Sequence, residues 1–340
     1  MQRFSGTVET VAKAAEKISA RVIALLPQFT LHDEDHLWNV LRLMEELAGE
    51  DTIARMSPLE CGIAILAAFT HDLGMALSAE ELDTLTDPSA GEADAHATPA
   101  AAAWRTYFDG HPLAERIREA RAIAAAENRP LTADEAVHLQ RGLGQIRSDY
   151  VRESHAREEG PTKLNRIEDW LHRIEKSLNL DLNYDGTDLS THIALLAMSH
   201  GQSIFWLAER LTRRNPPLLA REELVRAHRV KGQEVNWLFL SWLLRLADIM
   251  DFDASRTPAV LFDHIGIRDC TSMIEWQKHL SISEAPRFGQ GPDKATLQYV
   301  CECSPHPRIE KAIRDMTGWI NEELANVRGE FQRHPPTRGL

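Results

Sequence analysis

Two segments of this sequence are apolar on almost every side of a helix, yet each carries acidic residues near its end. The first covers residues 59–73 and ends with His71 and Asp72 close together, and the second covers residues 235–250 and includes Asp248. A helix without a polar face belongs at the centre of a bundle. A carboxylate buried there costs several kcal/mol unless it is paired or bound to a cation. We therefore expect a helical fold whose centre holds charged groups and whatever compensates them.

The predicted fold class is all-α. Apolar positions recur at helical spacing over most of the 340 residues, and contents of 43% apolar and 26% charged residues are ordinary for a globular protein. We expect residues 1–257 to form a helical domain in which residues 76–150 are an inserted helical segment or cap. Residues 258–340 are expected to pack on the same body as a small β-hairpin followed by a helix.

The same periodicity predicts the individual elements. Helices are expected at residues 8–26, 37–47, 104–126, 133–153, 163–178, 190–212, 222–231 and 307–332. Residues 279–284 and 296–303 alternate as two strands do, and a turn rich in proline and glycine at residues 286–292 joins them. These ranges predict one hairpin near the end of an otherwise helical chain.

The formal charge of −13 limits the partners of the chain. Nucleic acids and anionic membranes are held mainly by Lys and Arg, so neither is expected as a partner. No stretch of about 20 uninterrupted apolar residues is present, and residues 1–7 lack the pattern of a signal peptide. We therefore expect a cytoplasmic protein whose four cysteines are reduced.

A third segment brings another metal-ligand side chain toward the core. His36 opens an amphipathic helix with Val40 and Leu43 on its buried side, so its imidazole is expected to point inward. Together with the acidic segment ends, this predicts a metal site made of His36, His71, Asp72 and Asp248. Imidazoles mixed with carboxylates suit Mn, Fe, Co or Ni, and Mg is a further candidate.

A different explanation of these buried charges is a core in which they satisfy one another. In that arrangement Asp248 pairs with Arg245 or with His71. Asp72 then caps the helix that follows it. The sequence leaves both explanations open.

The order of these residues resembles the H…HD…D signature of HD-domain phosphohydrolases. The local contexts are also similar: His-x-x-x-Val at 36–40, an apolar helix before His-Asp-Leu-Gly at 71–74, and Leu-Arg-Leu-Ala-Asp at 244–248. The resemblance covers roughly residues 30–256. It implies an HD-domain helical bundle, one or two divalent metals, and hydrolysis of a phosphoester. It also implies that Asp72 is both a metal ligand and the catalytic acceptor of the nucleophile's proton.

Four fragments are similar to bacterial HD proteins that occur with chaperone-type GHKL ATPase domains. They lie at residues 29–36, 150–155, 244–257 and 276–279. This resemblance implies a role in antiviral defence. The chain departs from two better-known branches, because residues 74–77 do not continue as in dNTP triphosphohydrolases and residues 183–187 lack the Gly-Tyr-Pro signature of cyclic-di-GMP phosphodiesterases. Those particular substrates are not implied.

Further residues are predicted around the metal. Binuclear HD enzymes recruit extra histidines between the dyad and the final Asp, and His155 and His200 occupy that interval. His200 is also a candidate catalytic residue, although either histidine fits equally an ordinary core or surface position. The expected substrate-binding side chains are His32, Arg152, Lys231 and Arg256. The alternative for His32 is an ordinary turn residue before the helix that His36 opens, and for the three basic residues it is a solvated surface position. His192 is expected to be exposed.

These features predict metal-dependent hydrolysis of a phosphoester or phosphoanhydride, with a nucleotide or deoxynucleotide as the leading substrate. Three other functions stay open: a cyclic or oligonucleotide phosphodiesterase, a nucleotide-sensing or partner-binding module with little turnover, and a di-iron oxygenase. The expected partner is a phosphorylated small molecule. A homo-oligomer or a partner protein is a further expectation.

Overall fold

A computed structural model of the chain confirms a mainly helical fold. It describes residues 2–26, 29–88, 98–153, 162–184, 186–213, 217–220, 223, 228–265, 267, 270–289, 296–301 and 304–333. The strands within these ranges form only short two-stranded hairpins. The functional centre lies among the helices.

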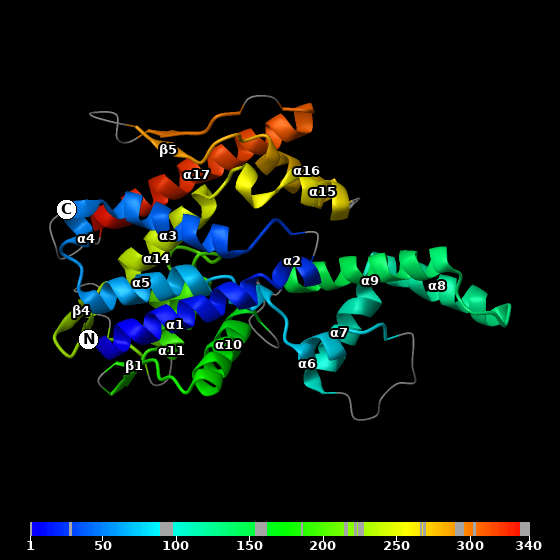
Figure 1. The fold of residues 1–340 in the computed structure, drawn as a ribbon, viewed down its shortest axis with the longest axis horizontal. Helices are drawn as coiled ribbons and strands as arrows, with labels where there is room; N and C mark the ends of the chain where they lie inside the picture. The colour runs from blue at the N-terminus through cyan, green and yellow to red at the C-terminus, as the bar shows by residue number, and fades with distance from the viewer. Residues whose placement is uncertain are drawn as a thin grey trace.

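Five helices surround the core of the molecule. They are α1 (Gln2–Ser19), α3 (Glu34–Ala48), α5 (Pro58–Thr70), α11 (Ser190–Ser199) and α14 (Trp237–Met250). Both apolar helices have well-defined starts, because the Ser57 side chain caps α5 and the Asn236 side chain caps α14. Helix α14 packs on α3, while α5 packs between α1 and α3 (Figure 1). Segments far apart in the sequence therefore meet in one bundle.

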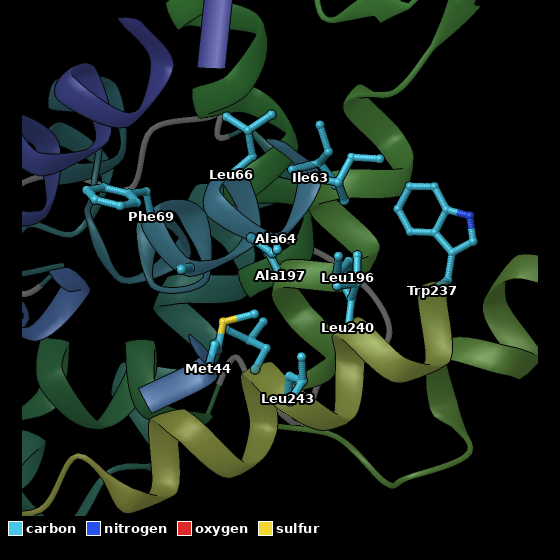
Figure 2. Packing of buried hydrophobic residues seen from close by; sticks show 14 of the residues in the cluster. Met44, Ile63, Ala64, Leu66, Phe69, Leu196, Ala197, Trp237, Leu240 and Leu243 are labelled. Atoms are coloured by element: carbon cyan, nitrogen blue, oxygen red, sulfur yellow. The ribbon is translucent and has the colours of Figure 1, made fainter. Parts of the chain in front are cut away.

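The bundle core is built from the faces that these helices turn toward one another. Figure 2 shows Met44 of α3, Phe69 of α5, Leu196 of α11 and Leu240 of α14 in one cluster. All four side chains are almost completely buried. The two apolar helices thus lie at the centre, as their lack of a polar face predicts.

The most apolar part of the sequence passes through this core. By length and composition alone, the segment Pro58–Thr84 is long and apolar enough to cross a membrane, but 89% of its most apolar window is buried inside the protein. Burial by neighbouring helices explains the composition of the segment.

The described helices within residues 76–153 form a helical arm with its own hydrophobic cluster. The arm contains α6 (Ala79–Thr84), α7 (Pro99–Gly110), α8 (Pro112–Ala126) and α9 (Ala133–Glu153), and it extends away from the bundle in Figure 1. Its cluster includes Trp104, Phe108 and Tyr150 and is joined by Val22, at the start of α2 (Val22–Leu25). The single helix expected at 104–126 is divided, because Pro112 begins a new helix after His111.

Shorter elements connect the main helices. Their bounds are α4 (Glu50–Ile53), η1 (Leu73–Met75), α10 (Lys163–Leu178), α12 (Trp206–Arg213), β1 (Asn183–Tyr184), β2 (Thr187–Asp188), β3 (His228–Val230) and β4 (Gln233–Val235). The expected helix at 190–212 is broken between α11 and α12. The helix expected at 222–231 is wrong at its end, since β3 and β4 form a hairpin there. Lys231 and Gly232 make its turn with positive φ angles of 49° and 81°.

The C-terminal region packs against the bundle. It comprises η3 (Ala254–Arg256), α15 (Ala259–Ile265), α16 (Cys270–Leu280), β5 (Arg287–Phe288), β6 (Leu297–Gln298) and α17 (Pro307–Arg333). The expected hairpin is found in altered form: Ile282 bridges Cys301, but the paired strand β5 lies within the expected turn at 286–292. The strand expected at 279–284 is wrong at its start because α16 continues to Leu280. Helix α17 contacts α14 and α16, which places part of the C-terminal region beside the apolar centre.

Candidate metal centre

Four possible ligands meet where three helices of the bundle approach one another. His36, His71, Asp72 and Asp248 each offer one ligand atom, and these atoms all lie within 4.8 Å of one another. Among them, His36 Nε2 lies 3.1 Å from His71 Nε2, and His71 Nε2 lies 3.0 Å from Asp72 Oδ2. Asp248 Oδ1 completes the group at 3.6 Å from His36 Nε2 and 3.5 Å from His71 Nε2.

Local structure explains how each ligand reaches this point. His36 lies in the first turn of α3, where the Asp33 side chain accepts a hydrogen bond from the His36 amide. His71 is the residue after α5 and Asp72 is the residue before the short helix η1, so both ligands lie in the turn between the two helices. Asp248 lies in the last turn of α14. Each ligand thus comes from the end of a helix held rigidly by the apolar core.

The hydrogen bonds of the two imidazoles decide which nitrogen carries a proton. His36 Nδ1 lies 2.6 Å from Asp251 Oδ2, and His71 Nδ1 lies 2.8 Å from the Ala68 carbonyl oxygen. An ionised carboxylate and a carbonyl only accept, so both Nδ1 atoms donate. In the neutral rings, both Nε2 atoms are therefore acceptors that face each other and two carboxylate oxygens. Four acceptors this close together are stable only with a positive charge between them, either a proton on an imidazole or a metal ion.

The alternative of a self-satisfied core is met only in part. Arg245 does not neutralise Asp248; it makes a two-pronged ion pair with Glu323, at 2.6 and 2.7 Å, and also donates to the His200 carbonyl. The Asp72 side chain makes no capping hydrogen bond to η1. Of the proposed pairings, only the contact between His71 and Asp248 is present.

The electrostatics show that this centre attracts positive charge. Burial disfavours protonated His71, but Asp72 and Asp248 outweigh burial and raise the pKa of His71 to about 10. Burial also opposes ionisation of the two carboxyl groups, yet His71 and its neighbours hold the pKa values of Asp72 and Asp248 below their usual range. Both carboxylates therefore stay ionised and available as ligands.

Two further histidines face the centre with their Nε2 atoms. His200, the residue after α11, donates from Nδ1 to the Ala197 carbonyl, and its Nε2 lies 3.8 Å from Asp72 Oδ1 and 3.9 Å from Asp248 Oδ2. His32 donates from Nδ1 to the Thr30 carbonyl, and its Nε2 lies 3.6 Å from Asp72 Oδ2. Burial lowers the pKa of each to about 3, so both are neutral at physiological pH.

A cavity of about 410 Å³ opens over the centre. Its walls come from both parts of the chain, because Asp72, His200 and Asp248 meet Lys278 and His279 of α16 and Trp319 of α17. The Asp248 side chain is 26% exposed, whereas His36 and His71 are fully buried. Asp248 therefore lies on the open side of the centre, toward the cavity.

The comparison with protein families agrees with this geometry. The HD-CE family model matches residues 26–326, which is most of the chain. The chain belongs to the HD-CE family. This result confirms the resemblance at the level of the HD superfamily, while the association with GHKL ATPases stays a prediction. Comparisons with curated proteins and with solved structures found no match.

The structure brings several other expected residues of the HD-CE chain to the cavity. Arg256 is buried and donates to the Leu31 carbonyl and to Thr30 Oγ1, at 2.7 and 3.2 Å. It also lies 3.3 Å from His32 Nε2, so it orders His32 and lines the cavity with it. These contacts argue against a solvated surface position for Arg256.

Three expected site residues are not placed there. Arg152, at the end of α9, pairs with Asp149 and is absent from the described lining of the cavity. Lys231 is likewise absent, because it forms the turn of the β3–β4 hairpin. His155 lies outside the described residues.

Three residues of the site escaped sequence-based reasoning. Asp251 holds His36, and its spacing of one helical turn after Asp248 was the available signal. Lys163 donates to Asp72 Oδ1 at 2.7 Å, but it begins an ordinary amphipathic helix and gives no signal in the sequence. Lys278 lines the cavity from a segment to which no role was assigned.

Proposed function

We propose that this HD-CE protein is a metal-dependent phosphohydrolase that cleaves a phosphoester or phosphoanhydride of a nucleotide or deoxynucleotide. The observation that carries the proposal is the convergence of four acceptor atoms, from His36, His71, Asp72 and Asp248, within 4.8 Å at the base of a cavity. Mixed nitrogen and oxygen ligands suit Mn, Fe, Co or Ni. When bound, such a metal polarises a phosphoryl oxygen and lowers the pKa of water.

The residues around the ligands support hydrolysis. Asp72 belongs both to the four-ligand group and to the cavity lining, so it would be a metal ligand that also receives the proton of an attacking water. His32 and His200 are neutral, and their Nε2 atoms accept from Arg256 and Lys163, which keeps these two basic side chains at the cavity beside Asp72. Asp251 keeps the His36 ring in the tautomer that leaves Nε2 free.

The charge of the cavity supports a phosphorylated substrate. Its basic side chains are Lys163, Arg245, Arg256 and Lys278, and its acidic side chains are Asp72, Asp248, Asp251 and Glu275. The lining is therefore balanced, although the chain as a whole has a charge of −13. A divalent cation would make the cavity positive, which favours binding of phosphate groups.

The size and the aromatic lining support a nucleotide. A volume of about 410 Å³ falls within the usual range for small-molecule sites. Phe29 and Trp319 supply planar apolar surface, and the Trp319 side chain is half-exposed. Phosphate groups at the metal and a base against an aromatic ring would use both kinds of lining.

The decisive experiment measures products. Metal-free protein is supplied with Mn²⁺, Fe²⁺, Co²⁺, Ni²⁺ or Mg²⁺ and a panel of nucleotides, deoxynucleotides, cyclic nucleotides and oligonucleotides, and the products are identified by mass spectrometry. We expect hydrolysis that disappears with a chelator and in Asp72→Asn. Undiminished turnover after complete metal removal would contradict the proposal. Tight nucleotide binding by the metal-loaded protein without any product would instead favour a nucleotide sensor.

A further inference from the structure

Lys163 is a lysine in an unusual environment. Its side chain is only 1% exposed, and its Nζ donates to Asp72 Oδ1 at 2.7 Å and to His200 Nε2 at 3.1 Å. An ammonium group is rarely buried unless it is fully paired. Here the pairing partners are a metal-ligand carboxylate and the imidazole that the sequence suggested for a second metal.

The two oxygens of Asp72 face different cation positions. Oδ2 lies 3.0 Å from His71 Nε2 and 3.4 Å from His36 Nε2, on the side of the four-ligand site. Oδ1 points the other way, toward Lys163. Asp72 therefore bridges one position suited to a metal and a second position that already holds an ammonium group.

The second position has the ligands of a metal site. His200 donates from Nδ1 to a backbone carbonyl, so its Nε2 offers a lone pair. This atom lies 3.8 Å from Asp72 Oδ1 and 3.9 Å from Asp248 Oδ2, which gives one nitrogen and two carboxylate oxygens around the same point. Lys163 Nζ is within hydrogen-bond distance of two of the three.

The ammonium group is held in place by packing. A Cβ atom built on Gly74 would collide with Cγ and with the backbone carbonyl of Lys163, so the lysine lies directly against the glycine. The Thr162 side chain caps α10 at the same point by accepting from the Asn165 amide. Lys163 is thus fixed at the start of its helix by its contact with Gly74. Gly74 follows Asp72 by two residues, so this contact holds the lysine beside the carboxylate.

We propose that the Lys163 ammonium group takes the place of a second metal ion, so that the centre binds one metal ion per chain beside one organic cation. The inference rests on the proposed metal site. An ammonium group between Asp72 Oδ1 and His200 Nε2 repels a metal from that position and uses the electron pairs that the metal would need. Lysine has three donors, and two are used here, so the third is available to an oxygen of a bound phosphoryl group. Lys163 lines the cavity in which that group would lie.

The test counts metal ions in the intact protein. Metal-free protein is titrated with Mn²⁺, the bound metal is measured by equilibrium dialysis and mass spectrometry, and electron paramagnetic resonance separates isolated ions from coupled pairs. We expect one isolated Mn²⁺ per chain in the wild type and in Lys163→Arg, which keeps the charge. Lys163→Ala removes the cation and leaves space, so it is expected to take up a second Mn²⁺ that is coupled to the first.

Lys278→Ala is the matched control. Lys278 is another buried lysine that lines the same cavity, but its partner is Glu275 at 2.6 Å and its removal is expected to leave one metal ion per chain. Circular dichroism checks that each variant is folded. If Lys163→Ala is unfolded, the number of Mn²⁺ ions bound per wild-type chain still tests the proposal.

The outcomes separate this inference from the proposed function. Two coupled Mn²⁺ ions in the wild type would overturn the inference and leave the phosphohydrolase proposal intact. A folded Lys163→Ala protein that still binds a single ion would also overturn it. A wild type that binds no divalent metal would instead contradict the metal site itself.

Discussion

Asp251 Oδ2 lies 2.6 Å from His36 Nδ1, and both side chains are buried. The pair joins the end of α14 to the start of α3, and it fixes the ring of a metal ligand whose other nitrogen faces the centre. Asp251 follows Asp248 by three residues, so one helix end supplies both a ligand and the group that orients another ligand. Carboxylates that hold a ligand histidine are typically worth a factor of about 10–100 in metal affinity.

The first prediction concerns this pair. Asp251→Asn keeps the shape of the side chain but removes its charge, so the His36 ring is held less firmly and its Nε2 is a poorer ligand. We expect Mn²⁺ affinity, measured by isothermal titration calorimetry, to fall about 10–100-fold. Asp263→Asn, an exposed acidic residue on α15, is the control and should bind as the wild type does. Equal affinities in the two variants would show that Asp251 has no orienting role.

The second prediction is that metal binding depends on all four ligands. His36→Ala, His71→Ala, Asp72→Ala and Asp248→Ala each remove one of the acceptor atoms that converge within 4.8 Å. We expect metal content per folded chain to fall strongly in every variant. His172→Ala, an exposed histidine of α10, should retain full content. Full occupancy in all four ligand variants would refute the assignment.

The central ligands were predictable because burial and charge conflict in the sequence itself. An apolar helix followed directly by His71 and Asp72 predicts a buried polar site whatever the fold. Asp248 is a second charged residue on an apolar helix and supports the same prediction. The hydrophobic pattern also predicted the helices that carry them. Those properties belong to single segments, which is why local reasoning found them.

Lys163 was not predictable in the same way. It begins an amphipathic helix, where a lysine is ordinarily solvated, and its burial depends on contact with Gly74, a residue distant in sequence. Arg152 and Lys231 were predicted to line the site and do not. A basic side chain alone does not indicate where in the fold it lies. For Lys231, the following Gly232 was a usable signal of a two-residue hairpin turn.

His192 was expected to be exposed and is buried at 5% exposure, where it stacks on Trp237. Its position two residues after a helix cap predicted that the His192 side chain is exposed to solvent. In the structure, the β3–β4 hairpin leads into α14 and brings Trp237 over the histidine. Sequence reasoning that expected a helix at 222–231 had no element to cover this position. The incorrect helix at 222–231 therefore explains the incorrect prediction that His192 is exposed.

The third prediction concerns the contact between Gly74 and Lys163. Gly74→Ala places a methyl group against the lysine stem and its carbonyl. We expect the free energy of unfolding, measured with urea, to fall by about 1–3 kcal/mol. Gly318→Ala is the control, because a Cβ there meets nothing within 4 Å and the exposed helix interior of α17 should gain about 0.5–1 kcal/mol. The change in the free energy of unfolding is expected to have opposite signs in the two variants. A stabilised Gly74→Ala protein would contradict the close contact between Gly74 and Lys163.

The fourth prediction is a loss of stability in acid that depends on His192. Burial and the nearby His228 lower the pKa of His192 to about 4 in the folded state. The unfolded chain has a pKa near 6.5 and therefore binds more protons below that pH, so stability falls as the pH decreases from about 6.5 to about 4. His192 should account for about 2 kcal/mol of the loss between about pH 7.5 and about pH 5.

Urea unfolding at both pH values tests this linkage. His192→Gln cannot be protonated, so its acid loss should be smaller than that of the wild type by the stated amount. His172→Gln changes an exposed histidine and should show the wild-type difference. The same acid loss in all three proteins would mean that His192 does not carry the linkage.

The last prediction tests the base-binding part of the proposed function. Trp319 lines the cavity, is 49% exposed, and donates from its indole Nε1 to Glu323 Oε1 at 3.3 Å. Arg245 holds Glu323 in turn and lies one turn before Asp248 on α14, so the indole is connected to the metal centre through fixed contacts. A ring held in this way provides a stacking surface for a nucleobase.

Trp319→Ala removes that surface, and stacking of a base on an aromatic ring is worth about 1–3 kcal/mol. We expect KM for the preferred nucleotide to rise about 5- to 150-fold, with a much smaller change in Trp319→Phe. A phosphoester without a base should be cleaved equally by all three proteins. Trp38→Ala removes a tryptophan of similar exposure on α3 that does not line the described cavity, and it should leave KM unchanged. An equal rise in KM for the base-free substrate would assign Trp319 a purely structural role, because only a stacking surface distinguishes the two substrates.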